Sequence, residues 1–111
     1  MIKLSVVIPC FNESKNLPLL ISRCQKTYAK EQSVEFIFVD NGSTDDTQEV
    51  IKDLTSNLPF VTLVHVEINK GYGHGILSGL KVAKGEVLSW THADLQTDPF
   101  DLLNGLNFFL D

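Results

Sequence analysis

Four strand-sized apolar runs, separated by stretches with helical periodicity, constrain the fold of this chain more than any other feature. The runs cover residues 4–8, 34–39, 61–66 and 87–90. Apolar side chains recur at helical spacing over about 14–30, 43–56 and 73–83, and a further helix start follows at 98–101. A strict alternation of strands and helices is typical of a parallel sheet. The sequence therefore predicts an α/β fold, a Rossmann-like and mostly parallel sheet of about four strands with helices on both faces.

Local signals set the expected ends and buried faces of these elements. Pro9 withdraws an amide donor and should end the first strand. Ser43 and Asp46 resemble a capping box, which would open the second helix. The apolar positions expected to pack on the sheet are Thr47, Val50, Ile51 and Leu54 in the second helix, and Ile76, Leu77 and Leu80 in the third.

Polar side chains follow each of the four apolar runs. These clusters are residues 11–13, 40–41, 69–71 and 92–96. Because right-handed crossovers place the carboxyl ends of parallel strands on one edge, we expect the clusters to meet in one crevice, where open α/β sheets bind ligands. In the last cluster, His92, Asp94 and Gln96 carry groups able to ligate a metal ion.

The charge of the chain limits its partners. Among 111 residues there are 9 Lys or Arg and 14 Asp or Glu, which gives a formal charge of −5, and the basic residues are scattered. Nucleic acid is not expected as a partner, because a phosphate backbone requires a basic face. An acidic protein that binds a diphosphate needs backbone amides, a helix N-terminus or a divalent cation instead.

Length and hydropathy are those of a single domain inside the cell. The hydrophobic content of 43% is enough for a core, and no apolar run approaches the roughly 20 residues that cross a bilayer. The N-terminus lacks the apolar segment of a signal peptide, so a cytoplasmic location is expected. Cys10 and Cys24 are accordingly expected to be reduced.

Four motifs in a fixed order give the chain a family resemblance. They are VVIPCFNE at 6–13, FVDNGSTDDT at 38–47, NKGYGHGILSGLKVAKG at 69–85 and THADLQTDP at 91–99. Together they resemble the nucleotide-sugar-dependent glycosyltransferases of family 2, which have a GT-A fold. The last motif, which continues into Leu-Gln, is most similar to the branch of polyprenyl-phosphate sugar transferases. The resemblance implies that residues 1–111 are the N-terminal nucleotide-sugar-binding part of such a domain, with the acceptor-binding part and the catalytic base further on, so that no catalytic residue is expected in this stretch.

The resemblance implies roles for two overlapping sets of residues. The nucleotide-sugar-binding set is Pro9, Phe11, Glu13, Asp40, Lys70, Gly71, His92, Ala93 and Asp94. The metal-binding set is Asp94, His92 and Gln96, which would hold Mn²⁺ or Mg²⁺ against the sugar-nucleotide diphosphate. Asp40 would accept a hydrogen bond from the nucleobase, whereas Asn41 departs from the second aspartate that is common in the family.

Each role has an alternative that needs no ligand. Asp40 could be a turn aspartate, Phe11 a core residue and Glu13 a first-turn acid favoured by the helix dipole. Lys70 could be an exposed lysine at a glycine-rich helix entry. The spacing of the nearby glycines does not fit a dinucleotide-binding loop, which would also follow the first strand and not the third.

His92 stands where the family motif usually has its first acid. One possibility is that His92 ligates the metal and biases the site toward Mn²⁺. A second is that His92 donates to ribose or phosphate while Asp94 and Gln96 hold the ion. The third is that the substitution abolishes metal binding.

The resemblance implies an inverting, metal-assisted glycosyltransferase. A sugar would move from a UDP- or GDP-sugar to a lipid phosphate or glycan acceptor, and the full-length protein would act at the inner face of the membrane. This chain alone would be inactive. The alternatives are a nucleotidyltransferase, although no Gly- and Arg-rich loop follows the first strand, and a non-catalytic sugar-nucleotide-binding or assembly module. Trp90 and residues 108–110 would lack neighbours in so short a chain, so self-association is expected.

Overall fold

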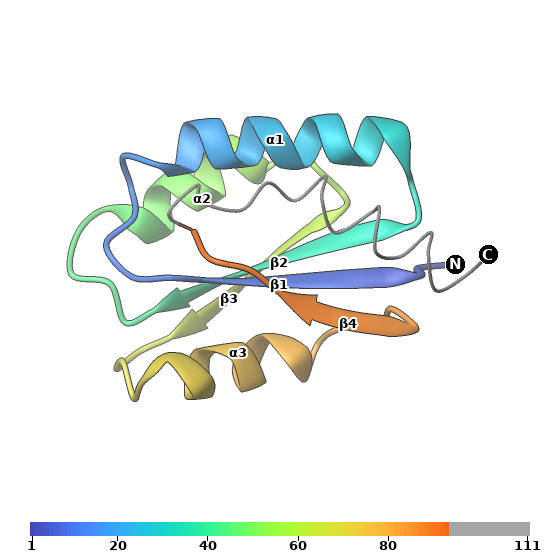
Figure 1. Cartoon of the computed structure of the whole chain (residues 1–111). Coiled ribbons are helices and arrows are strands. Elements are labelled where there is room, and N and C mark those ends of the chain that lie inside the picture. The colour runs from blue at the N-terminus through green and yellow to red at the C-terminus, as the bar shows by residue number, and fades with distance from the viewer. Residues whose placement is uncertain (94–111) are drawn as a thin grey trace.

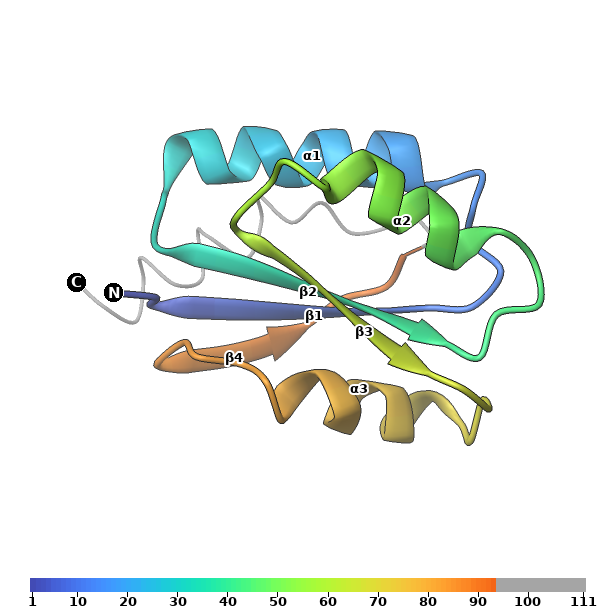
Figure 2. The same ribbon diagram turned by 180° about the vertical axis from the view of Figure 1, so that it is seen from behind.

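The sheet and its helices follow the predicted alternation. The computed structural model describes residues 1–93 of the chain (Figures 1 and 2). Its elements are β1 (Leu4–Cys10), α1 (Leu17–Lys30), β2 (Val34–Asn41), α2 (Thr47–Thr55), β3 (Val61–Val66), α3 (Tyr72–Leu80) and β4 (Val87–Trp90). The four strands are parallel and lie in the order β3-β2-β1-β4. The α/β prediction is confirmed, and the helix start expected at 98–101 lies outside the described residues.

Helices cover both faces of the sheet. Helices α1 and α2 lie on one face and α3 lies on the other (Figures 1 and 2). Parallel pairing keeps partnered residues on the same face, so Val7 and its partner Ile37 both point toward α3. Within residues 1–93, no helix combines the length and the apolar character that a bilayer span requires.

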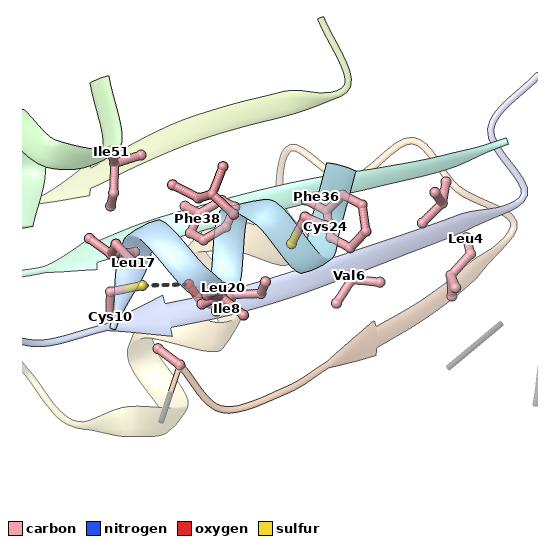
Figure 3. Close-up of a cluster of buried hydrophobic side chains, with 13 residues drawn as sticks. Leu4, Val6, Ile8, Cys10, Leu17, Leu20, Cys24, Phe36, Phe38 and Ile51 are labelled. Carbon is pink, nitrogen blue, oxygen red and sulfur yellow. Dashed lines mark hydrogen bonds between the residues drawn. The ribbon is translucent and has the colours of Figure 1, made fainter. Parts of the chain in front are cut away.

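The larger core lies between the sheet and helices α1 and α2. Side chains from β1, β2 and the buried stripe of α1 interdigitate there (Figure 3). Phe36 and Phe38 are fully buried, and each such side chain contributes on the order of 2 kcal/mol by leaving water. Tyr28 extends this core by stacking on Phe60, with ring centroids 3.9 Å apart. Cys10 and Cys24 are both buried, and neither is in a disulfide bond.

Glycines form the buried face of α3. Gly75 and Gly79 are the buried residues of this helix, and a methyl group on Gly79 would lie 2.5 Å from Val7 Cγ1. The backbone of α3 therefore sits directly on the sheet. Of the three residues expected to pack there, Leu80 joins the smaller core but Leu77 is 60% exposed, so that prediction is wrong for Leu77. Placing large side chains on this face would have pushed the helix away from the strands.

Several predicted element ends need correction. Strand β1 continues through Pro9 to Cys10. The pairing of β1 with β4 ends at Val7 and Trp90, so Pro9 lies beyond this pairing and its missing backbone N–H costs no hydrogen bond to β4. The capping box is also wrong. Helix α2 begins at Thr47, and Ser43 Oγ instead accepts a hydrogen bond from the Asn12 amide at 3.0 Å.

The ends of the helices also differ from the ends that the periodicity of apolar residues predicts. Helix α1 begins at Leu17, with a proline in its first turn, and α3 ends at Leu80, short of the expected 83. Leu54 of α2 is 41% exposed, so its predicted burial is wrong. Periodicity locates a helix better than its ends, because end residues depend on loop contacts that lie far apart in sequence.

A buried polar cluster anchors the connection from α3 to β4. Glu35 accepts hydrogen bonds from Ser5 Oγ at 2.6 Å and from the Lys84 amide at 2.7 Å. Ser5 Oγ in turn accepts from the Gly85 amide at 2.8 Å. The cluster satisfies a carboxylate that would be costly to bury alone, and it fixes where β4 begins.

Strand β4, at one edge of the described sheet, carries exposed apolar side chains. Leu88 is 50% exposed and Trp90 is 46% exposed, on the sheet face where α3 packs on β1 and β2 and meets β4 through Tyr72, which contacts Trp90 edge-on. Exposed apolar surface on an edge strand favours association. We therefore expect this chain to self-associate in sedimentation velocity runs over a concentration series. A sedimentation coefficient that stays at the monomer value at the highest concentration would contradict this prediction.

Candidate nucleotide site

A pocket lies at the carboxyl edge of the sheet. Its volume is about 280 Å³. Its lining residues are Pro9, Cys10, Phe11, Glu13, Asn41, Asn69, Tyr72, His92 and Ala93. The segments that follow all four strands contribute to this list, so the expected convergence of strand ends is confirmed. Five residues of the predicted nucleotide-sugar-binding set line the pocket, namely Pro9, Phe11, Glu13, His92 and Ala93.

Asp40 lies behind the pocket and not in its lining. Its side chain is on the α1 and α2 face of the sheet and is 1% exposed. One carboxylate oxygen is 3.0 Å from His65 Nδ1, and the other accepts from the Ser43 amide at 3.3 Å. Both oxygens thus have partners within the protein, and a contact to a nucleobase stays a prediction for this residue.

Asn41, which the sequence analysis left without a role, faces the pocket. Successive strand residues point to opposite faces, so Asn41 lies on the α3 side, where its side chain is 3% exposed. Its Nδ2 donates to the Gly71 carbonyl at 3.2 Å. Its Oδ1 is buried and has no hydrogen-bond partner among residues 1–93. The alternation of side chains along a strand could have indicated this placement from the sequence, because only one residue of the Asp40-Asn41 pair can face α3.

Gly75 leaves room for the Asn41 amide. A methyl group at Gly75 would come within 2.8 Å of Asn41 Nδ2. The first turn of α3 therefore holds the amide from one side, and the Gly71 carbonyl orients it from another. The acceptor oxygen is fixed in place before any ligand arrives, which reduces the entropy lost on binding.

Asn12 joins the loops that position Phe11 and Glu13. It has a positive φ of 53°, and its Oδ1 accepts from the amides of Thr44 at 2.8 Å and Asp45 at 3.2 Å. Asparagine tolerates this left-handed conformation better than most residues. The loop after β1 is thereby tied to the loop after β2, and Phe11 is left 46% exposed on the pocket wall.

The described lining of the pocket carries a negative charge. Glu13 is the carboxylate in the described lining, and its Oε2 accepts from Asn16 Nδ2 at 2.8 Å. No lysine or arginine belongs to the lining that the structure describes, and Lys70 and Gly71 lie just beside it. Burial, with smaller effects of Glu13 and Asp40, raises the pKa of the Cys10 thiol far above its usual range. A buried thiol held protonated in this way is a poor nucleophile.

His92 is held by two aromatic residues at the mouth of the pocket. Tyr72 Oη lies 2.8 Å from His92 Nδ1, and the two rings stack with an interplanar angle of 17°. Trp90 packs edge-on against both rings. His92 is the member of the predicted metal set that the structure describes, because Asp94 and Gln96 lie outside the described residues. Residues 1–93 alone contain no group of three or more His, Cys, Asp or Glu side chains suited to a metal ion.

A comparison of the sequence with protein families identifies the family of the chain. Residues 5–111 match the family described as glycosyl transferase family 2. The chain belongs to glycosyl transferase family 2. The chain is similar to an undecaprenyl-phosphate 4-deoxy-4-formamido-L-arabinose transferase of Aeromonas hydrophila, to which it is 39% identical over 101 residues covering 88% of the chain. A transferase of the same description from Proteus mirabilis is 34% identical over 103 residues covering 90% of the chain. The chain spans 31% of the length of each of these two relatives.

Solved family-2-like structures share the GT-A fold of this chain. The mannosyltransferase PcManGT from Pyrobaculum calidifontis, in complex with GDP-Man and Mn²⁺, has a TM-score of 0.86 and 25% identity. That similarity covers 98% of this chain and 32% of the mannosyltransferase. TarS 1-349 of S. aureus in complex with UDP has a TM-score of 0.82 and 25% identity, covering 97% of this chain and 32% of TarS 1-349. The prediction of a GT-A fold is confirmed.

Proposed function

We propose that residues 1–111 form the nucleotide-sugar-binding part of a glycosyltransferase. The donor would be a UDP- or GDP-sugar, and the acceptor a lipid phosphate or glycan. The observation that carries this proposal is the pocket at the carboxyl edge of the sheet, whose lining includes Asn41, a side chain with a buried Oδ1 that has no hydrogen-bond partner among residues 1–93. Burying an unpaired acceptor costs about 1–3 kcal/mol, which a ligand that donates a hydrogen bond would recover.

A nucleobase fits the chemistry of this pocket. Uracil and guanine both present a ring N–H, which Asn41 Oδ1 can accept. Phe11 supplies an exposed aromatic wall for the base, and Glu13 can accept from a ribose hydroxyl. In this arrangement Asp40 supports the site from behind through His65 and the Ser43 amide. Lys70 and Gly71, beside the pocket, would face ribose or phosphate.

We propose a divalent metal ion at the diphosphate, Mn²⁺ or Mg²⁺, held by Asp94 and Gln96 with or without His92. Such an ion supplies positive charge that stabilises the nucleotide diphosphate as it leaves the sugar. A pocket whose described lining contains Glu13 but no lysine or arginine among residues 1–93 gains from this charge. The Mn²⁺ bound by PcManGT supports the choice of metals.

The names of the curated relatives favour a lipid-phosphate acceptor. Undecaprenyl-phosphate stands in the names of the Aeromonas and Proteus transferases. Such an acceptor would place the full-length protein at the inner face of the membrane. Because this chain matches about a third of the length of these relatives, with 31% covered, we expect it to supply the donor side of the site and to show no transfer on its own.

Nucleotide binding to this chain tests the proposal. Calorimetric titration with UDP, GDP and their sugar conjugates is expected to show binding that a chelator weakens and that Mn²⁺ or Mg²⁺ restores. Replacing Asn41 with alanine should weaken that binding about tenfold, because one hydrogen bond to the base is lost. The matched control is Asn57→Ala, an exposed asparagine in the loop between α2 and β3 at the opposite edge of the sheet.

Two results would contradict the proposal. One is the absence of nucleotide binding by both this chain and the full-length protein. The other is a clear preference for nucleoside triphosphates, which would favour a nucleotidyltransferase. Sugar-nucleotide binding by the full-length protein without any transfer would instead support a non-catalytic binding module.

A further inference from the structure

Asn12 lies between two pocket residues but does not itself belong to the described lining. Phe11 and Glu13, its neighbours in the loop after β1, both line the pocket. The Asn12 side chain instead reaches the loop after β2, where its Oδ1 accepts from the amides of Thr44 at 2.8 Å and Asp45 at 3.2 Å. These two hydrogen bonds, the Asn12 clamp, join residues that are 32 and 33 positions apart in sequence.

The two pocket residues beside Asn12 are held to different degrees. The Glu13 amide donates to Oγ1 of the fully buried Thr47 at 3.0 Å, and Glu13 Oε2 accepts from Asn16 Nδ2 at 2.8 Å. The Phe11 side chain has no polar group that could be tied in this way, and it is 46% exposed, so packing fixes it only in part. The position of Phe11 therefore depends on the backbone of the next residue, which is Asn12.

Order in this loop affects how tightly a ligand binds. Loop segments with few buried contacts open locally at a low cost in free energy. A ligand that needs the loop in one conformation binds more weakly by the free energy of ordering it. A side chain that orders the loop in advance therefore raises the affinity for a ligand that it does not contact.

We infer that Asn12 is a positioning residue for nucleotide binding, which acts by holding Phe11 in place and not by contact with the ligand. This inference rests on the proposed function, in which Phe11 forms an aromatic wall for the base. Asparagine suits the role because it tolerates the left-handed conformation, with φ of 53°, and also supplies a side-chain acceptor.

Three substitutions of Asn12 separate these two properties. Glycine adopts the left-handed conformation but has no acceptor, and alanine lacks both properties. Aspartate keeps both. The Thr44 hydroxyl, which accepts from Asn12 Nδ2 at 3.2 Å, can rotate to donate to an aspartate oxygen. Asn12→Asp is therefore the conservative variant that should restore the clamp.

The clamp can be tested in the ligand-free chain. Nitrogen-15 relaxation is expected to show the order parameter of the Phe11 amide falling from about 0.85 to about 0.6 or below in Asn12→Gly and Asn12→Ala, and keeping its wild-type value in Asn12→Asp. Both variants without an acceptor are needed, because glycine also adds backbone freedom of its own. A fall in Asn12→Gly with the wild-type value in Asn12→Ala would overturn the inference.

Nucleotide affinity tests the role of the clamp. In calorimetric titration, Asn12→Gly and Asn12→Ala should each weaken UDP or GDP binding by about tenfold, because binding must then order the loop. The matched control is Asn57→Gly, an exposed asparagine in the loop between α2 and β3, which should bind like the wild type. Asn12→Asp is compared with the wild type using uridine or guanosine, which carry no phosphate for the added carboxylate to repel. Weakening by aspartate equal to that by glycine would overturn the inference.

A double-mutant cycle shows whether Asn12 acts through Phe11. In a chain that carries Phe11→Ala, adding Asn12→Gly should weaken nucleotide binding by less than about threefold, because the ring that the clamp positions is already gone. The same tenfold loss with and without the Phe11 ring would mean that the two residues act independently, and would overturn the inference.

The outcomes separate this inference from the proposed function. If the wild type and the full-length protein bind no nucleotide, the proposed function fails, and the role of Asn12 in nucleotide binding fails with it. If the wild type binds nucleotide and the Asn12 variants bind it equally well, only the role given to Asn12 is wrong.

Discussion

Replacing Gly42 with alanine is expected to lower the free energy of unfolding by about 3 kcal/mol, from left-handed backbone strain combined with overpacking. Gly42 follows β2 directly and has a φ of +69°. An added methyl group would overlap the backbone nitrogen of Asn69 and lie 3.0 Å from the carbonyl carbon of Ile68. These are main-chain atoms, so no side-chain rotation relieves the overlap. Urea denaturation followed by circular dichroism would measure the loss.

Gly71→Ala is the control for this substitution. Gly71 also has a positive φ, +107°, but an added methyl group would meet nothing within 4 Å in the described part of the chain. Both variants place a side chain at positive φ, and Gly71, with ψ of 165°, lies in a region essentially restricted to glycine. The loss at Gly71 therefore measures backbone strain without overlap. A loss of stability for Gly42→Ala that does not exceed the roughly 1–2 kcal/mol of left-handed strain alone would show that the loop after β3 can move away from β2 at little cost.

Gly79→Ala is expected to destabilise the fold by about 2 kcal/mol through overpacking beneath α3. The new methyl group would lie 2.5 Å from Val7 Cγ1 and 2.9 Å from Val39 Cγ2, between the helix and the sheet. Alanine gains up to about 1 kcal/mol of helix propensity over glycine, which offsets only part of this cost. Differential scanning calorimetry should show a lower Tm.

Gly73→Ala in the same helix provides the matched comparison. An alanine methyl there would have no neighbour within 4 Å among residues 1–93, so only the propensity gain applies and Tm should rise slightly. Opposite signs for the same substitution in one helix would confirm that Gly79 is required for close packing. A rise in Tm for both variants would mean that α3 can lift from the sheet without loss.

The sequence predicted the sheet well because its signals are local and repeated. Each strand is a continuous apolar run of the length that a doubly covered parallel strand needs, and each connection has helical periodicity. Alternation of such segments leaves few topologies once crossovers are right-handed. The convergence of the four strand ends on one pocket followed from the same rule.

The predictions that went wrong depended on contacts between distant residues. Leu77 has the character of a core residue, but the close seating of α3 is decided by Gly79 against Val7, which periodicity of apolar residues does not report. Ser43 resembles a helix cap, but its hydroxyl is taken by the Asn12 amide, 31 positions earlier in the chain. In each case a tertiary contact overrode a correct local preference.

The site was predicted in outline, but Asn41 was left without a role in it. Asp40 and Asn41 are adjacent in sequence, and a carboxylate is the more obvious partner for a base N–H. Strand geometry sends Asp40 toward His65 and Asn41 toward the pocket. Deciding which residue faces which side required the register of β2 against β1, which the sequence alone did not fix.

Because β4 is anchored by Ser5, Glu35 and Gly85, the stability of the pocket can differ from the stability of the whole fold. β4 is the shortest of the described strands, with 4 residues, and its Gly85 anchor closes a contact across 80 positions of sequence. Such a strand can detach while β1, β2 and β3 keep their shared core, since local openings cost less than global unfolding. Detachment would carry His92 away from Tyr72 and remove one wall of the pocket. The capacity to bind a ligand is therefore expected to be lost under milder conditions than the fold of residues 1–93, and a bound nucleotide would stabilise β4 before the other described strands.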